Sequence, residues 1–364
     1  MQTSSRKLLV GLAVLPVIGF VVYRASGMIR HSEFSGTEML RAVRSANPYL
    51  LLLSLIAIYV CYAVRSLRWK VFQQNLGPSS FWNIYKMTLA GFSALQLLGR
   101  PGEPVRPFLL ARKEKLPISG MFGVYLLERI FDFASMAVIA TIALLGFRAG
   151  AQSGETAQAL EKAARPAASV LVLGILAATV LLVYLRLHGT GLLERQLHGW
   201  LHAHGWRSKI AGTVLEFARG VQTIRNWRDL SLAVFYSAVH WFLVLCIYVW
   251  VATSFGGTLG SLTLSDAMIV LAFTLVGSLV QLPGVGGGSQ AVSTIAYTQI
   301  FLVKTEAALA ASIVLWLITF AVVSLVGVPL LIHEGLSLGK LKELAEHEKE
   351  AAIEGAAQQG ESAP

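Results

Sequence analysis

The sequence is short of charged residues. They make up 14% of the 364 residues, whereas soluble domains carry roughly a quarter. This shortage excludes an ordinary soluble domain. The mean hydropathy is +0.63, and several apolar runs reach the roughly 18–20 residues that cross a bilayer core. The composition therefore predicts an all-α, polytopic helical membrane protein.

Cysteine is scarce as well. Cys61 and Cys246 both lie in apolar runs and no CxxC motif is present, so we expect neither a disulfide nor a metal site. The sequence also lacks a Ser-His-Asp set and the paired carboxylates of a soluble catalytic cleft. These absences predict a protein that is not an enzyme and needs no cofactor.

Positive charge is in excess, with 30 Lys and Arg against 20 Asp and Glu. No basic run with interleaved aromatic residues accompanies it, so nucleic acid is not an expected partner. The excess fits loops that face the cytoplasm and anionic lipid headgroups. Arg6 and Lys7 precede the first apolar run and favour a cytoplasmic N-terminus. With the predicted spans, the C-terminus is also cytoplasmic.

Apolar segments separated by polar loops fill most of the chain. Two of them, Ile84–Leu98 and Ala291–Val303, are too short to span alone and adjoin helix-breaking stretches. We predict about six full spans plus two re-entrant or broken segments. The segments are Leu8–Tyr23, Tyr49–Val64, Ile84–Leu98, Gly120–Phe147, Pro166–Leu185, Leu230–Phe255, Leu264–Pro283, Ala291–Val303 and Ala307–Ile332.

The order of the segments suggests a domain organisation. Residues 1–332 form a single transmembrane domain, in which 49–147 and 230–332 are candidate inverted repeats and 166–185 is the connecting span. Broken segments at matching positions of two repeats point to a substrate path. Residues 333–364 are expected to form a polar, partly disordered cytoplasmic tail. Leu8–Tyr23 fits an uncleaved anchor better than a cleaved signal peptide, and Ser153–Arg165 a polar connector.

The stretch "GRPGEPVRP" (99–107) follows the first short segment. Its three prolines stop a helix and its glycines allow a tight turn. Glu103 and Arg106 are spaced to pair, and Arg100 with Arg106 is suited to hold a phosphate, because guanidinium binds its oxygens bidentately. The alternative is a plain cytoplasmic loop.

The stretch "LLERIFDF" (126–133) places three charges early in a long apolar run. Glu128 and Asp132 share one helix face, and Arg129 lies three residues before Asp132. Charges at membrane depth are costly and face the protein interior or a wet cavity. They either line a polar path or form an ion pair that locks helices together, and both interpretations stay open.

The stretch "QLPGVGGGSQ" (281–290) interrupts a third apolar region. Non-helical backbone in a bilayer is tolerated only where protein or water covers it, so this break is expected to line a cavity. The N–H groups that start the next helix near Ser289 are then able to face an anion. A simple outer hairpin is the alternative. His240, in a span, is expected to join two helices by a hydrogen bond, with a proton relay as the alternative.

These motifs together resemble the transmembrane region of lysylphosphatidylglycerol synthases, which also occurs as stand-alone flippase-like proteins. The resemblance covers about Tyr49–Ile332. A family G-E-x-x-R core matches Gly102, Glu103 and Arg106, and an E-R-x-x-D core matches Glu128, Arg129 and Asp132. The family's P-G-G-x-G-x-x-E pattern matches more loosely at Pro283, Gly284 and Gly287, and Gln290 stands where that pattern has Glu.

The resemblance implies the lipid-translocating membrane part and not lysyl transfer, because the chain ends about 30 residues past its last predicted span. The predicted function is an inner-membrane flippase-like protein that translocates or binds a lipid with an anionic or phosphate headgroup. The alternative is a non-transporting membrane partner that presents lipid to a separate enzyme. A membrane-embedded enzyme is a third hypothesis. The site residues expected to serve the headgroup are Arg100, Gly102, Glu103, Arg106, Glu128, Arg129, Asp132, Pro283, Gly284, Gly287 and Gln290, with His240 as a further candidate.

Overall fold

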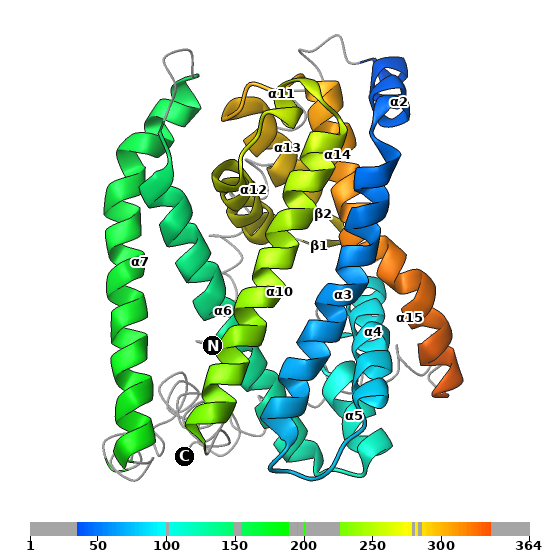
Figure 1. Ribbon diagram of the computed structural model, residues 1–364, viewed down its shortest axis with the longest axis vertical. Coiled ribbons are helices and arrows are strands. Elements are labelled where there is room, and N and C mark those ends of the chain that lie inside the picture. The colour runs from blue at the N-terminus through cyan, green and yellow to red at the C-terminus, as the bar shows by residue number, and fades with distance from the viewer. Residues whose placement is uncertain are drawn as a thin grey trace, which may run out of the picture. The chain divides into compact units, whose positions relative to one another are not determined.

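The computed structural model describes residues 35–99, 102–148, 154–188, 195, 200, 226–278, 281–282 and 286–335. Helices make up nearly all of this part of the chain (Figure 1). Their bounds are α2 (Gly36–Ser45), α3 (Pro48–Gln73), α4 (Phe81–Leu98), α5 (Val105–Glu114), α6 (Ile118–Gly146), α7 (Glu155–His188), α10 (Trp227–Ser254), α11 (Gly257–Gly260), α12 (Leu264–Gly277), α13 (Gly288–Gln299), α14 (Thr305–Trp316) and α15 (Val322–His333). A short π-helix, Leu317–Ala321, joins α14 to α15.

Four helices of the described chain are long and apolar enough to cross a bilayer. They are Pro48–Gln73, Gly120–Gly146, Trp227–Ser254 and Thr305–His333. The all-helical membrane architecture predicted from the sequence is thereby confirmed. The count of six spans stays a prediction, since Leu8–Tyr23 lies outside the described residues.

The predicted connector Ser153–Arg165 is wrong from Glu155 onward. Those residues form the first three turns of α7, which also contains the predicted span Pro166–Leu185. The segment "ETAQALEKAAR" is rich in Ala, Glu, Gln and Lys, which are strong helix formers. This polar segment is the part of α7 that precedes the apolar run, and its polarity does not interrupt the helix.

The chain divides into two compact units, and each is described by itself. The first collects Met1–Ile58, Met136–Ile175 and Phe242–Thr319, and the second collects Tyr59–Ser135, Leu176–Trp241 and Phe320–Pro364. Short helices pack together in each unit, among them α12 with α13 in the first and α4 with α5 in the second. The inverted repeat itself remains a prediction.

In the first unit α12 packs against α13, and α13 packs against α14. α12 has 14 residues, or about 21 Å at 1.5 Å per residue, which is shorter than the roughly 30 Å of a bilayer core. It starts with a capping box, in which Thr263 and Asp266 bond to each other's backbone N–H. Close packing on α13 requires glycine at position 277, because a Cβ there would overlap the carbonyl of Gly288.

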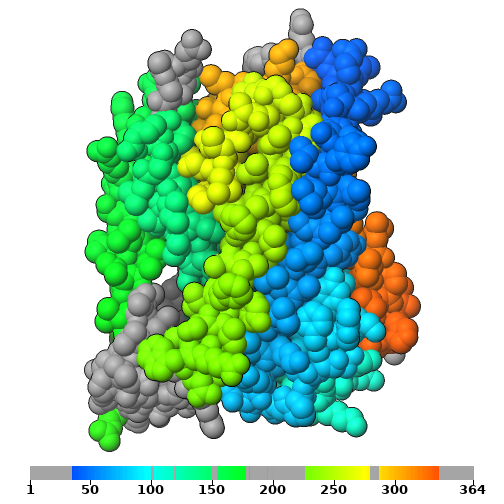
Figure 2. Space-filling model, in the orientation of Figure 1, coloured from blue at the N-terminus to red at the C-terminus, as the bar shows by residue number. Residues whose placement is uncertain are grey.

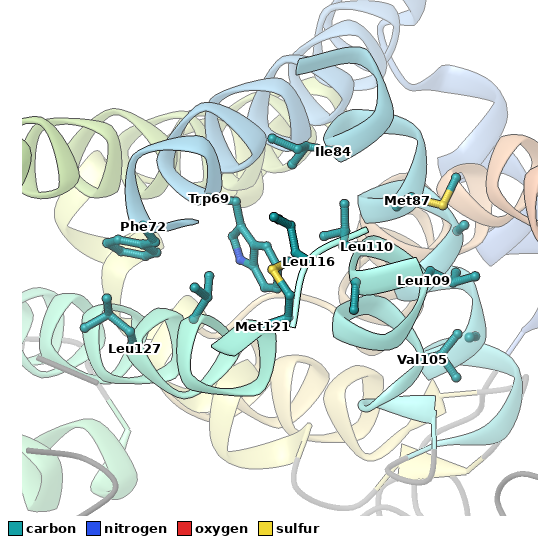
Figure 3. Close-up of a cluster of buried hydrophobic side chains, with 14 of the residues drawn as sticks. Trp69, Phe72, Ile84, Met87, Val105, Leu109, Leu110, Leu116, Met121 and Leu127 are labelled. Atoms are coloured by element: carbon teal, nitrogen blue, oxygen red, sulfur yellow. The ribbon is translucent and has the colours of Figure 1, made fainter. Parts of the chain in front are cut away.

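In the second unit α4 packs against α5 and against α15. Side chains of α3, α4, α5 and α6 fill the space between them, and Figure 3 shows Trp69 extending from α3 toward Met121 of α6. Lipid tails are as apolar as these side chains, so close packing and polar contacts, more than the hydrophobic effect, hold membrane helices together. The buried hydrogen bonds and ion pairs of this unit therefore contribute a large share of its stability.

Candidate functional site

Helix α3 continues well beyond the apolar run that predicted it. The run ends at Val64, but no glycine or proline follows before Gly77, and the helix reaches Gln73. Arg65 and Arg68 therefore lie on a helix, and both are buried. Neither arginine belongs to the site residues predicted from the sequence.

Both arginines bind the carboxylates of α6. Arg65 donates from Nε to Oε1 of Glu128 at 2.6 Å and from Nη2 to Oδ2 of Asp132. Arg68 donates from Nη2 to Oδ1 of Asp132 at 2.6 Å and lies 3.4 Å from Oε1 of Glu128. The i, i+4 spacing predicted for Glu128 and Asp132 thus presents two carboxylates to two guanidinium groups.

Arg106, which lies on α5, also binds Glu128. Its Nη1 donates to both oxygens of Glu128, at 3.0 and 2.8 Å, and its guanidinium lies 4.0 Å from the centre of the Trp69 ring. α5 comes this close to α4 because position 91 is glycine, where a Cβ would overlap the Cβ of Arg106. We name Arg65, Arg68, Arg106, Glu128 and Asp132 the arginine–carboxylate cluster.

Helix α10 supplies two further contacts. Nη1 of Arg68 donates to the hydroxyl of Ser237 at 2.8 Å, and Nη1 of Arg65 lies 3.4 Å from Nε2 of His240. Guanidinium has only donors, so Nε2 accepts and the ring proton belongs on Nδ1, which lies 3.3 Å from the carbonyl of Cys61. Residues 59–73 of α3 and 227–241 of α10 run side by side, as Figure 2 shows. The arrangement supports the prediction of His240 as a link between helices.

More exposed groups border the cluster. The side chain of Arg129 is 29% exposed, with Nη2 3.6 Å from Oε2 of Glu128 and its guanidinium over the ring of Tyr125. The hydroxyl of Tyr125 donates to Oε2 of Glu103, which is half-buried. The expected pair of Glu103 with Arg106 is therefore replaced by two pairs, each with a residue of α6.

Positive charge exceeds negative charge in the cluster. With both carboxylates ionised, three buried guanidinium groups face two buried carboxylates, and the partly exposed Arg129 adds a fourth positive charge. Several N–H groups of these arginines have no hydrogen-bond partner among the described residues, namely those of Arg68 Nε, Arg106 Nε and Nη2, and Arg129 Nε. Buried charge is normally paired and fully hydrogen-bonded, so these arginines depart from the usual pattern within the described residues.

The glycine-rich break lies in the first unit. Gln281 and Leu282 (β1) pair antiparallel with Gly287 and Gly286 (β2), so the chain reverses direction here. Gly287 has φ of 92°, a conformation that glycine adopts without strain. The amide oxygen of Gln290 accepts from the Gly287 N–H at 2.7 Å and from the Ser289 hydroxyl at 3.0 Å. Gln290 thus satisfies the N–H of the residue that precedes α13, and the expectation that the N–H groups near Ser289 face an anion stays a prediction.

The structure brings together five of the predicted site residues, Glu128, Asp132, Arg106, Arg129 and His240, in the second unit. Gly102, close to Arg106 in the sequence, is buried, and a Cβ there would overlap the carbonyl of Ala94. Arg100, Pro283 and Gly284 lie outside the described residues. Within the ranges described, no three His, Cys, Asp or Glu side chains are grouped as metal ligands would be.

Sequence reasoning missed Arg65, Arg68 and Ser237. A signal for the two arginines was present, since both sit in the stretch "CYAVRSLRWKVF", which has apolar residues on both sides and no helix breaker. Ser237 has no comparable signal, because a single serine in a span usually bonds to its own helix, as this one does to the carbonyl of Ala233.

The comparisons with known proteins agree with one another. Residues 8–327 match the family described as the lysylphosphatidylglycerol synthase TM region. A curated relative, a UPF0104 membrane protein of Methanothermobacter thermautotrophicus, is 21% identical over 343 residues, which cover 90% of this chain and 97% of that protein.

Proposed function

Since the chain belongs to the lysylphosphatidylglycerol synthase TM region family, we propose that it is a flippase-like membrane protein that binds a lipid with an anionic, phosphate-type headgroup and carries it across the bilayer. The proposal places it in a bacterial cytoplasmic membrane with both termini in the cytoplasm. The four long apolar helices support the membrane character, and the arginine–carboxylate cluster supports a lipid with an anionic headgroup.

The observation that carries the proposal is the surplus of buried guanidinium charge. Arg106 uses only one of its three nitrogens on Glu128 and leaves Nε and Nη2 without a partner in the described chain. A phosphate accepts two parallel N–H bonds from one guanidinium group. Binding such a headgroup would satisfy these donors and compensate the excess positive charge.

The residues of the site then have different roles in binding the headgroup. Arg106 and Arg129 are the headgroup contacts, because Arg129 is the partly exposed arginine of the site and Arg106 has unpaired donors. Arg65 and Arg68 hold Glu128 and Asp132 in place, and Glu128 in turn fixes the guanidinium plane of Arg106. Glu103, held by Tyr125, adds a carboxylate that repels headgroups of higher negative charge.

Reconstitution tests the proposal. The full chain is placed in liposomes with headgroup-labelled phosphatidylglycerol or phosphatidylcholine, and the fraction of label that reaches the inner leaflet is followed with a membrane-impermeant quencher. We expect faster movement of phosphatidylglycerol. Arg106→Gln with Arg129→Gln should slow it, whereas Arg112→Gln, which removes an exposed arginine of α5, should not.

Equal rates in the wild type and the double variant would contradict the proposal. If headgroup binding depends on Arg106 but no lipid moves, the proposed binding of the lipid stands and the proposed transport does not. That result would favour the alternative, a partner that presents lipid to a separate membrane enzyme.

A further inference from the structure

The second unit also has a cavity on the face of α3 that lies opposite the arginine–carboxylate cluster. The residues of α3 that enter the unit's interior, Arg65, Arg68, Trp69 and Phe72, follow an i, i+3, i+4, i+7 pattern. Leu67, Lys70, Val71 and Gln74 follow the same pattern two positions later, which is a rotation of about 200° around the helix. The second set therefore faces away from the arginine–carboxylate cluster.

These four residues line a cavity of about 300 Å³. The loop after α3 and Tyr236 of α10 also contribute to its lining. The described residues that line it are Leu67, Lys70, Val71, Gln74, Gly77, Pro78, Ser79 and Tyr236.

The lining has two chemical parts. Leu67, Val71 and Pro78 are apolar, while Lys70 is the one charged residue among the described residues of the lining and carries a positive charge. Gln74, Ser79 and Tyr236 add an amide and two hydroxyl groups that are able to donate hydrogen bonds. This lining matches an anionic amphiphile. Its phosphate would lie against the cation and the neutral donors, and its first acyl carbons would lie against the apolar side chains.

The level of the cavity fits the membrane surface. It lies where α3 ends, at Gln73. The first residues of α4 and α10 in the same unit include Trp82 and Trp227, which are 65% and 63% exposed. Exposed tryptophans gather at the boundary between acyl chains and headgroups, so Lys70 lies at a height where a lipid phosphate is available.

We propose that this cavity is a second lipid site, which holds the phosphate of an anionic phospholipid on Lys70 and its acyl chain along Leu67 and Val71. The lipid is bound from the surrounding leaflet and is not the transported molecule, because the cavity and the arginine–carboxylate cluster occupy opposite faces of α3. The inference does not rest on the transport proposal.

Native mass spectrometry of the full chain in a neutral detergent tests the site. The protein is titrated with phosphatidylglycerol or with phosphatidylcholine of the same acyl chains. We expect a tighter first binding event for phosphatidylglycerol, weakened about tenfold in Lys70→Gln, as expected for the loss of one charge-assisted hydrogen bond. Lys86→Gln, which removes an exposed lysine of α4 outside the cavity, should bind as the wild type does.

Two further measurements distinguish a lipid bound in the cavity from free phosphate bound there. Leu67→Gln should weaken phosphatidylglycerol binding, since it places an amide against the acyl chain, and millimolar inorganic phosphate should not displace the lipid. The thermal unfolding midpoint of each variant is measured without lipid, because Lys70 also lies in the last turn of α3, where a cation stabilises the helix.

Three results would overturn the inference: unchanged binding in Lys70→Gln, equal binding of phosphatidylcholine, or full displacement by inorganic phosphate. Arg106→Gln distinguishes the two sites. It should lower lipid movement in liposomes and leave this binding event in place, whereas Lys70→Gln should lower the binding event alone.

Discussion

Nη1 of Arg106 lies 3.0 and 2.8 Å from the two carboxylate oxygens of Glu128. This contact ties a short helix, α5, to a helix long enough to cross the bilayer, α6. Glu128 also accepts from Arg65, so a single buried carboxylate connects three helices.

Glu128→Gln should strongly destabilise the protein. The change leaves three buried arginines with Asp132 as their remaining buried carboxylate among the described residues, and removing one partner of a buried ion pair costs about 3–5 kcal/mol. The thermal unfolding midpoint in neutral detergent measures the effect. Glu334→Gln is the control, because its bond to Lys113 lies at a partly exposed position and such pairs contribute about 0–1 kcal/mol. Similar midpoints for the two variants would contradict the structure.

Arg68 and Asp132 should show a measurable coupling free energy. A double-mutant cycle with Arg68→Met and Asp132→Asn is expected to give about 1 kcal/mol or more, since contacting residues of one network couple by about 0.5–3 kcal/mol. The matched cycle, Lys113→Met with Glu334→Gln, should give less because solvent screens it. The reverse order of the two coupling energies would show that the buried pair does not form as described.

Gly91→Ala should lower stability, although alanine is the better helix former. The added Cβ would overlap the Cβ of Arg106, and forcing extra volume into a tight contact costs about 1–3 kcal/mol. Gly123→Ala is the matched control, because nothing lies within 4 Å of its added Cβ. It should be neutral or stabilising by up to about 1 kcal/mol. An unchanged unfolding midpoint for Gly91→Ala would rule out close contact of α4 and α5.

Gln290→Ala should destabilise the start of α13 by about 1 kcal/mol, the usual cost of losing a capping side chain. Gln290→Glu keeps an oxygen acceptor for the N–H of Gly287 and places negative charge at a helix N-terminus, where it is favourable. We therefore expect the Glu variant to lie closer to the wild type than the Ala variant does. Hydrogen exchange of the Gly287 amide, faster in Ala than in Glu, reports the cap directly.

The sequence by itself determined the class of protein and part of the site. Scarce charge and long apolar runs require helices that satisfy their own backbone hydrogen bonds in lipid. The i, i+4 spacing of Glu128 and Asp132 fixed two carboxylates on one helix face, because local spacing decides which side chains share a face of a helix. Gln290 was singled out as the neutral residue of the glycine-rich break, but its contact with the Gly287 N–H was not foreseen.

Only the tertiary structure decided which charges meet. Arg65 and Arg68 lie past the predicted segment Tyr49–Val64 but inside α3, because hydropathy records where apolar residues end and not where a helix ends. Their partners lie more than 60 positions away in the sequence, and such a pairing depends on how α3 and α6 pack. The same packing separates Arg106 from Glu103 and leaves two nitrogens of Arg106 without a partner in the described chain. The charge surplus arises from packing, because no acidic residue lies near Arg65 and Arg68 in the sequence, and α6 presents two carboxylates to three buried arginines.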